Sequence, residues 1–199
     1  MLTESMSRAN RAIYNLPNFV SFIRILMAPV LFYFAFANLP KWFLAALLFS
    51  GFTDVLDGFL ARMLNQITAM GSRLDSWGDF TIYSTMAICA WILWPEITAR
   101  EIIAYTAIVA SIALPVIIGL IKFRTVTSYH TWTVKVAVVV TFIGYILLYA
   151  EILDWPFRVA AVFSVVAAIE EIAITVLMRH EHVDVRSLWA AMKYRKQDS

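Results

Sequence analysis

The sequence predicts an all-helical protein that crosses a membrane six times, preceded by an amphipathic helix on the membrane surface. Hydrophobic residues make up 61% of the 199 residues and charged residues 15%, against roughly 45–50% and about 25% in soluble globular proteins. Six apolar stretches are each long enough for a span, which needs about 20 residues. Only short polar segments separate them, so a separate soluble catalytic domain does not fit. Any chemistry must be carried by the helices.

The segment before the first span, residues 1–16, is predicted to lie on the bilayer surface. Arg8 and Arg11 alternate there with Met6, Ile13 and Leu16 at helical spacing, which is typical of an amphipathic helix whose apolar face enters the headgroup region. A cleaved signal peptide is not expected, because the next apolar stretch is too long for a signal-peptide core and no small-residue cleavage site follows it.

One membrane domain, residues 17–178, is predicted to contain all the spans, followed by a basic cytoplasmic tail at 179–199. Prolines and charged residues interrupt the apolar pattern at each predicted loop. The predicted spans are 17–38, 41–62, 71–94, 102–121, 134–153 and 156–178.

Lysines and arginines orient the chain. If the N-terminus is cytoplasmic, eleven of them lie on its side of the membrane and only Lys41, Arg100 and Arg158 lie on the other. Because cytoplasmic loops carry the excess of basic residues, both termini are predicted to be cytoplasmic. The net charge of +2 gives no reason to expect a nucleic-acid partner, since proteins that bind nucleic acid carry a concentrated basic face. The single cysteine, Cys89, excludes an intrachain disulfide.

Four of the fourteen acidic residues, Asp54, Asp57, Asp75 and Asp79, lie within the second and third predicted spans. Carboxylates at bilayer depth are costly and usually mark a functional site. Helical spacing puts each pair on one face of its helix. Counted from the helix ends at the short cytoplasmic loop, the four carboxylates lie at matching depths, roughly 6–12 Å from those ends. The sequence therefore predicts one carboxylate cluster.

Such a cluster favours a hard divalent cation. All-oxygen sites select Mg²⁺, Mn²⁺ or Ca²⁺, and four close carboxylates cannot all stay ionised without a counter-charge. The alternative is a buried network paired with Arg24, Arg62 or Arg73. That network would not explain Gly58 and Ala61, which leave the neighbouring face without bulky side chains. Arg62 at the rim suits a phosphate.

From Asp54 to Asp79 the residues form the pattern D-x2-D-G-x2-A-R-x8-G-x3-D-x3-D. At all eight fixed positions it resembles the signature of the CDP-alcohol phosphotransferases (CDP-alcohol phosphatidyltransferases), among them the phosphatidylglycerophosphate synthases. The six-span plan resembles the same family over nearly the whole chain. The resemblance implies a homodimeric enzyme of phospholipid biosynthesis, in which an acceptor hydroxyl displaces CMP from CDP-diacylglycerol at a site with two divalent cations, Mg²⁺ or Mn²⁺.

The resemblance also implies roles for the motif residues. Asp79 would act as the general base on the acceptor hydroxyl, and Gly71 would keep the third span close to the ligand. The metal ligands would be Asp54, Asp57, Asp75 and Asp79. The nucleotide would be bound by Asp54, Gly58, Ala61, Arg62, Gly71 and Ser72.

Two further sets of polar residues are candidate acceptor or lipid contacts. Asn18, Ser21 and Arg24 recur every third residue and share a helical face, as in family members that use CDP-diacylglycerol. The alternative is snorkelling or interhelical pairing by Arg24. Lys135 lies where several relatives carry basic residues for an anionic acceptor. A positive-inside anchor is the alternative there.

The predicted acceptor is glycerol-3-phosphate, which the first-span pattern favours. Relatives that use it or form cardiolipin usually continue the third span as D-P-x-A-D-K, whereas this chain has D-S-W-G-D-F from Asp75 to Phe80. Serine, inositol phosphate or another alcohol therefore stay alternatives. Alternatives of another class are an intramembrane Mg²⁺-dependent prenyltransferase and a divalent-cation transporter, although a transporter would need polar residues through to the far side of the membrane.

Some acidic and histidine residues keep an open role. Glu170 and Glu171 lie deep in the last predicted span, where they could pair with a neighbouring helix or a dimer partner. His180 and His182 belong to a charged segment that leaves the bilayer, with metal ligation as the alternative. We expect a multi-pass protein of a bacterial inner membrane, with its active site on the cytoplasmic side, no nucleic-acid partner, and membrane lipids as its surroundings.

Overall fold

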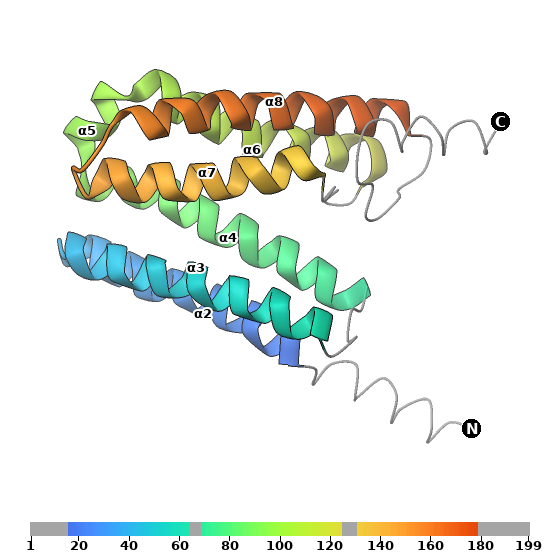
Figure 1. Ribbon diagram of the computed structural model, residues 1–199, viewed down its shortest axis with the longest axis horizontal. Helices are drawn as coiled ribbons and strands as arrows, with labels where there is room; N and C mark the ends of the chain where they lie inside the picture. The colour runs from blue at the N-terminus through green and yellow to red at the C-terminus, as the bar shows by residue number, and fades with distance from the viewer. Residues whose placement is uncertain (1–15, 64–68, 125–130, 179–199) are drawn as a thin grey trace. The chain divides into compact units, whose positions relative to one another are not determined.

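The computed structural model describes residues 16–63, 69–124 and 131–178, with side chains at 25–53, 77–124 and 131–178. Every secondary-structure element in those ranges is a helix, which confirms the predicted all-α class (Figure 1). The predicted surface segment up to residue 15, and the tail at 179–199 with His180 and His182, lie outside the described residues. The helices are α2 (Leu16–Phe36), α3 (Pro40–Met63), α4 (Ala69–Leu93), α5 (Pro95–Arg100), α6 (Ile102–Phe123), α7 (Trp132–Tyr149) and α8 (Trp155–Leu177).

Three of the described helices, α6, α7 and α8, are long and apolar enough to cross a membrane. α2 contains a shorter apolar stretch, Ile25–Phe36. α3 and α4 have 24 and 25 residues, roughly 36 Å each at 1.5 Å per residue, but charged motif residues interrupt their apolar character. The chain is therefore a helical membrane protein, and the count of six spans stays a prediction.

Residues 1–95 form the first of two compact units, in which α2 packs against both α3 and α4. Leu31 of α2 and Phe43 and Leu47 of α3 are fully buried. The ring of Phe43 meets that of Trp94 edge to face, with centroids 5.8 Å apart. Because Trp94 directly follows α4, this contact joins the ends of α3 and α4 that lie away from the 64–68 connection.

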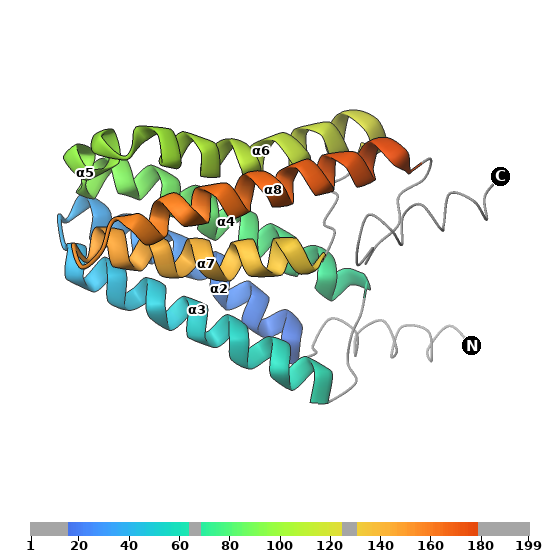
Figure 2. The same ribbon diagram turned by 45° about the horizontal axis from the view of Figure 1, so that its top comes forward.

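Residues 96–199 form the second unit, in which α8 packs against both α6 and α7. The side of α8 that is buried carries small residues, among them Ala160, Ser164 and Ala168. A Cβ on Gly144 of α7 would lie 3.0 Å from the Cα of Phe157, so the two backbones approach closely there. Small residues allow this approach in membranes, where packing rather than the hydrophobic effect joins helices. α7 stops short of the ends of α6 and α8 (Figure 2).

One predicted connection contains a short helix, and one predicted span boundary was wrong. The predicted loop at 95–101 contains α5, which Pro95 can begin because a proline at the first helical position lacks only an N–H that would have no helical partner. The predicted span 134–153 begins at Trp132 and ends at Tyr149. Glu151 adopts a left-handed conformation with φ 58°, and the amide of Ile152 donates to the carbonyl of Leu147 at 2.9 Å, which ends the helix early.

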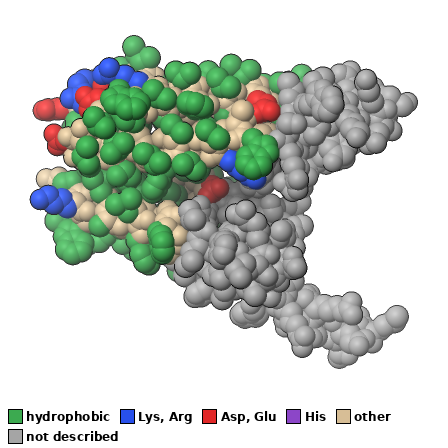
Figure 3. All heavy atoms as spheres, viewed as in Figure 1, with side chains coloured by type: hydrophobic (Ala, Val, Ile, Leu, Met, Phe, Trp, Pro, Cys, Tyr) green, Lys and Arg blue, Asp and Glu red, His purple; other side chains and the backbone are tan. Residues whose placement is uncertain are grey.

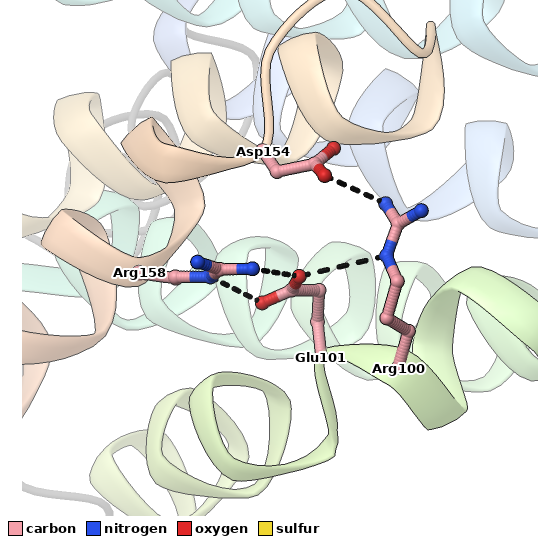
Figure 4. A network of polar contacts seen from close by, with 4 residues as sticks. All are labelled: Arg100, Glu101, Asp154 and Arg158. Carbon is pink, nitrogen blue, oxygen red and sulfur yellow. Dashed lines mark hydrogen bonds and ion pairs between the residues drawn. The ribbon is translucent and has the colours of Figure 1, made fainter.

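Ion pairs join the connections at one end of the second unit (Figure 4). Arg158 of α8 donates from Nε and Nη2 to the two carboxylate oxygens of Glu101, at 2.8 and 2.7 Å. Arg100 lies 3.0 Å from Asp154, which precedes α8, and 3.6 Å from Glu101. In Figure 3 charged side chains gather where α8 begins, and hydrophobic side chains cover much of α7 and α8.

Glu101 is the buried member of this network, with 4% of its side chain exposed. The hydrogen bonds from Arg158 lower the pKa of the Glu101 carboxyl below its ordinary value of 4.5 and outweigh burial, which alone would raise it. The carboxylate is therefore held in its charged form. The sequence placed Arg100 and Arg158 on one side of the membrane but gave no sign of this pairing, since Arg158 and Glu101 are 57 residues apart.

Lys122 joins α6 to α8 at the ends of the two helices that lie away from the Glu101 network. Its ammonium Nζ donates to the carbonyls of Thr175 and Val176, at 2.9 and 2.8 Å. Carbonyls in the last turn of a helix have no partner within the helix, and a lysine can supply one. From the sequence, Lys122 is only one of the eleven basic residues on the predicted cytoplasmic side. The structure shows that it also joins the end of α6 to the end of α8.

Candidate active site

The motif residues lie on two helices joined by residues 64–68. α3 carries the first five and continues without a break to Met63, and α4 carries the last three after beginning at Ala69. The backbone is helical in both segments, as the predicted faces required. The motif residues are Asp54, Asp57, Gly58, Ala61 and Arg62 on α3, and Gly71, Asp75 and Asp79 on α4, where Ser72 is a further nucleotide-contact candidate.

The observed helix ends also support the matching depths. Asp57 lies six residues before Met63, and Asp75 lies six residues after Ala69. Asp54 and Asp79 lie nine and ten residues from the same ends. At 1.5 Å per residue the aspartate positions fall about 9–15 Å from the ends of α3 and α4, slightly deeper than the sequence predicted because both helices are longer than the predicted spans.

The buried face of α3 leads to its aspartates. Phe43, Leu47 and Ser50 recur at spacings of four and three residues and are all buried. The same spacing continues along the backbone to Asp54 and Asp57, so the aspartate positions lie on the face that is buried in the other half of the helix. The side chains of both aspartates, like those of Gly58, Ala61 and Arg62, lie outside the described residues.

α4 has the same organisation and runs in the opposite direction (Figure 1). Ile82 and Met86 are buried, and Asp79 continues their face at helical spacing, with its side chain half-buried. Asp75 shares the face by position, although its side chain, like those of Gly71 and Ser72, lies outside the described residues.

The other face of α4 is aromatic and exposed. Trp77 is 54% and Phe80 38% exposed, and their rings meet edge to face with centroids 6.4 Å apart. Trp77 stands at the variable position x of the D-P-x-A-D-K pattern, and Phe80 stands at its lysine position. Both aromatic side chains are exposed, whereas Asp79 is half-buried.

Lys135 lies in the first turn of α7, in the second unit. Its side chain is exposed, and its ammonium lies 5.3 Å from the ring centroid of Trp132 in the same turn. Its amide donates to the carbonyl of Thr131 at 3.1 Å. The other candidate contacts, Asn18, Ser21 and Arg24, are on α2 at one-turn spacing, and their side chains lie outside the described residues.

A hydroxyl pair joins this first turn to Glu170 of α8. Thr131 caps α7 and accepts a hydrogen bond from the amide of Val134 at 3.3 Å. The hydroxyls of Thr131 and Thr133 are 2.9 Å apart, and Thr133 donates to Oε2 of Glu170. This contact answers in part the open question about Glu170: it pairs with a neighbouring helix. The sequence signal that could have found it is the Thr-x-Thr pair directly before an apolar run.

Among the described side chains, no three His, Cys, Asp or Glu residues come together as metal ligands. Three of the four motif aspartates are outside that set, so their metal binding stays a prediction. Comparison with known proteins gives the family. The family model for CDP-alcohol phosphatidyltransferases matches residues 14–183, which include every described helix. This chain belongs to the CDP-alcohol phosphatidyltransferase family.

Curated relatives in the CDP-alcohol phosphatidyltransferase family carry two kinds of name. A CDP-diacylglycerol–glycerol-3-phosphate 3-phosphatidyltransferase of Aquifex aeolicus is 40% identical over 75 residues, 37% of this chain and 42% of the relative. One of Salmonella choleraesuis is 35% identical over 104 residues, 45% and 56% of the two chains. Human cardiolipin synthase (CMP-forming) is 32% identical over 123 residues, 59% of this chain and 38% of the relative. No solved structure matches the chain significantly.

The matched stretches cover about half or less of these relatives' lengths. Membership of the CDP-alcohol phosphatidyltransferase family nevertheless decides between the classes of protein that the sequence left open. The prenyltransferase and the cation transporter were both suggested by the intramembrane aspartates. The family match spans 170 of 199 residues, from 14 to 183, and includes the complete eight-position motif.

Proposed function

We propose that this chain transfers a phosphatidyl group from CDP-diacylglycerol to the hydroxyl of glycerol-3-phosphate, with release of CMP. The observation that carries the proposal is the complete motif, placed at matching depths on two helices within the family match. Relatives named for this reaction in two bacteria support the donor and the acceptor.

The motif residues fit a pair of divalent cations by their donor chemistry. Asp54, Asp57, Asp75 and Asp79 offer only carboxylate oxygens, which Mg²⁺ and Mn²⁺ prefer. Two such cations, when bound, would neutralise the pyrophosphate and stabilise the phosphate that leaves with CMP. Four carboxylates gathered at one site also need a positive charge to stay ionised together.

In this proposal each remaining motif residue has one task. Asp79 accepts the proton of the acceptor hydroxyl, whose oxygen bonds to the phosphorus that carries diacylglycerol. The bond from that phosphorus to the CMP oxygen breaks, and CMP leaves with the electron pair. Gly58 and Ala61 border the cytidine, and Arg62 holds the nucleotide phosphate. Gly71 and Ser72 complete the nucleotide contacts.

Asn18, Ser21 and Arg24 on α2, and Lys135 on α7, are the proposed acceptor or lipid contacts, with Lys135 the candidate partner of the acceptor phosphate. A second acceptor is favoured by one observation: human cardiolipin synthase (CMP-forming) matches 59% of this chain, more than the two glycerol-3-phosphate enzymes do. Phosphatidyl transfer that forms cardiolipin is therefore the second candidate.

We also propose the finer topology: six spans, a surface helix at 1–16, a cytoplasmic active site and both termini in the cytoplasm of a bacterium, with the enzyme acting as a homodimer. The excess of basic residues on one side supports the orientation. Asn10→Cys and Ala190→Cys, each made singly in a Cys89→Ala background, should react with an impermeant maleimide only from the cytoplasmic side. Labelling of either from the opposite side would refute the orientation.

The function is tested with the purified full chain in lipid vesicles containing labelled CDP-diacylglycerol. With Mg²⁺ and glycerol-3-phosphate we expect CMP and phosphatidylglycerophosphate. Asp79→Asn should lower the turnover about 100-fold or more, because the general base is lost. Asp154→Asn, which alters an exposed carboxylate outside the motif sequence, is the matched control and should keep the wild-type rate.

The outcomes separate the candidates. Wild-type turnover by Asp79→Asn would remove the proposed base. Cardiolipin as the product, formed without added glycerol-3-phosphate in vesicles that contain phosphatidylglycerol, would favour the second candidate. Serine and inositol phosphate are tested in parallel, since both were open alternatives. No lipid product with any acceptor would reject CDP-diacylglycerol as the donor.

A further inference from the structure

Glu170 lies within α8, seven residues before Leu177, and has no task in the reaction proposed above. Its Oε2 accepts a hydrogen bond from Thr133, 37 residues away in the first turn of α7. We propose that Glu170 is a positioning residue: through Thr133 and Thr131 it fixes the first turn of α7 and so holds Lys135, the proposed acceptor contact, in place. This inference rests on the proposed function of Lys135.

The hydrogen bonds in this contact have a definite direction. Thr133 has one hydroxyl hydrogen and donates it to Glu170. In the 2.9 Å contact between the two threonines, Thr131 must therefore be the donor. Thr131 in turn accepts from the amide of Val134. Three hydrogen bonds thus run in one direction, from the backbone of α7 to a carboxyl oxygen of α8, and Glu170 sets the direction of the bond between the two threonines.

Lys135 is linked to these hydrogen bonds through a backbone contact with Thr131. Its amide donates to the carbonyl of Thr131 at 3.1 Å, so Thr131 holds the turn by both its hydroxyl and its carbonyl. The ammonium of Lys135 lies over the ring of Trp132, which is 72% exposed and belongs to that turn. Because the described contacts of Lys135 are all within its own turn, the position of its charge follows the position of the turn.

The turn lies recessed between two longer helices. Lys122 at the end of α6 reaches the carbonyls of Thr175 and Val176 in α8, whereas Thr133 reaches Glu170, five residues earlier. Five residues of α8 correspond to about 7–8 Å along the helix axis. In Figures 1 and 2 the first turn of α7 stops short of the ends of α6 and α8. A hydrogen bond at this depth is less screened by water than one at the surface.

A second bond between the same helices offers a matched comparison. Thr141 and Ser164 are joined hydroxyl to hydroxyl at 2.9 Å, two turns further along α7. This bond also holds α7 to α8, but it has no connection to the first turn. If Thr133 and Glu170 only hold the two helices together, removing either bond should have similar effects. If they position Lys135, only the bond to Glu170 should matter for the acceptor.

The kinetic test measures the KM for glycerol-3-phosphate and for CDP-diacylglycerol separately. Thr133→Val and Glu170→Leu should each raise the acceptor KM about tenfold through misplacement of Lys135, with the donor KM unchanged. Thr133→Ser and Glu170→Gln keep a donor and an acceptor, so both should stay close to wild type. Thr141→Val should also stay close to wild type. Equal rises in both KM values would overturn the proposal.

A double variant shows whether the effect passes through Lys135. In a Lys135→Met background, Thr133→Val should raise the acceptor KM by less than about twofold, because the residue it positions is already absent. Independent, multiplying effects would overturn the proposed route through Lys135. If the wild-type chain gives no product with glycerol-3-phosphate, the proposed function fails and the acceptor role of Lys135 fails with it.

Hydrogen exchange of the full chain in vesicles tests the positioning without turnover. Thr133→Val should accelerate amide exchange in a peptide covering residues 131–138 several-fold, because the order of hydrogen bonds around Val134 and Lys135 is lost. The rest of α7 should keep its wild-type rates, and Thr141→Val should not affect the first turn. Unchanged exchange at 131–138 in Thr133→Val would show that Glu170 does not fix this turn.

Discussion

Gly144 is the position at which the packing of α7 on α8 is most directly testable. A Cβ added there would lie 3.0 Å from the Cα of Phe157, 3.0 Å from the carbonyl oxygen of Pro156 and 3.1 Å from the amide nitrogen of Phe157. All three are backbone atoms in the first turn of α8. They cannot move aside by a rotamer change, so Gly144→Ala requires α8 to shift by a few tenths of an ångström.

Two opposing effects set the expected magnitude. Alanine in place of glycine favours a helix by about 1 kcal/mol, whereas overpacking of a close contact costs about 1–3 kcal/mol. Because the neighbouring atoms belong to the backbone, we expect the upper part of that range and a net destabilisation of about 1–2 kcal/mol. For a chain of this length, 1 kcal/mol corresponds to a shift in Tm of about 2–4 °C. Gly144→Leu should destabilise further.

The measurement is the thermal midpoint in mild detergent, followed by tryptophan fluorescence, with full recovery on cooling checked first. Ile143→Val is the matched control, because Ile143 directly precedes Gly144 on α7 and is 50% exposed. It should change the free energy of unfolding by less than about 0.5 kcal/mol. A midpoint for Gly144→Ala equal to or above that of the wild type would refute the close backbone contact between α7 and α8.

Three further predictions concern charged residues. Glu101→Gln should lower the free energy of unfolding by about 1–3 kcal/mol, since a nearly buried carboxylate loses its charged hydrogen bonds to Arg158. The pKa of Glu101 is lowered on folding, so its contribution to the stability of the fold is present above about pH 4.5 and is lost as the pH falls through the folded-state pKa. Acid should therefore reduce the unfolding midpoint of the wild type more than that of the variant. Lys122→Met should destabilise by about 1–2 kcal/mol and Lys122→Arg by less, as measured by the same thermal midpoint; equal effects would argue against the bonds to the end of α8. EDTA should abolish phosphatidyl transfer and Mn²⁺ restore it, and Asp57→Asn should weaken Mn²⁺ binding measured by electron paramagnetic resonance, which tests the proposed ligand without turnover.

Much of the candidate site could be predicted because it depends on local spacing. Asp54 and Asp57 lie one turn apart, as do Asp75 and Asp79, and an unbroken helix alone places each pair on one face. A short connection between α3 and α4 then brings the two pairs to matching depths. The break between α2 and α3 was also readable locally, because Pro40 can begin a new helix. In the structure Asn38, two residues earlier, adopts φ 55°.

Hydrophobicity could not show which apolar residues face protein and which face lipid. Leu148 is fully buried, whereas Ile143 on the same helix is 50% exposed, although both suit a membrane span equally. Lipid tails are as apolar as leucine, so no sequence pattern has to distinguish the two surfaces. For this reason six apolar segments could be outlined from the sequence, but the packing of α8 against α6 and α7 could not.

The sequence by itself determined the membrane class, the helical segments and the faces on which the four motif aspartates lie, because all three depend on composition and on the pitch of a helix. Only the tertiary structure decided that Arg158 pairs with Glu101, that Lys122 reaches the end of α8, and that Thr133 donates to Glu170. Each of these contacts joins residues 37 to 57 positions apart. Helical periodicity fixes where a side chain points on its own helix, but the helix that it meets is set by packing.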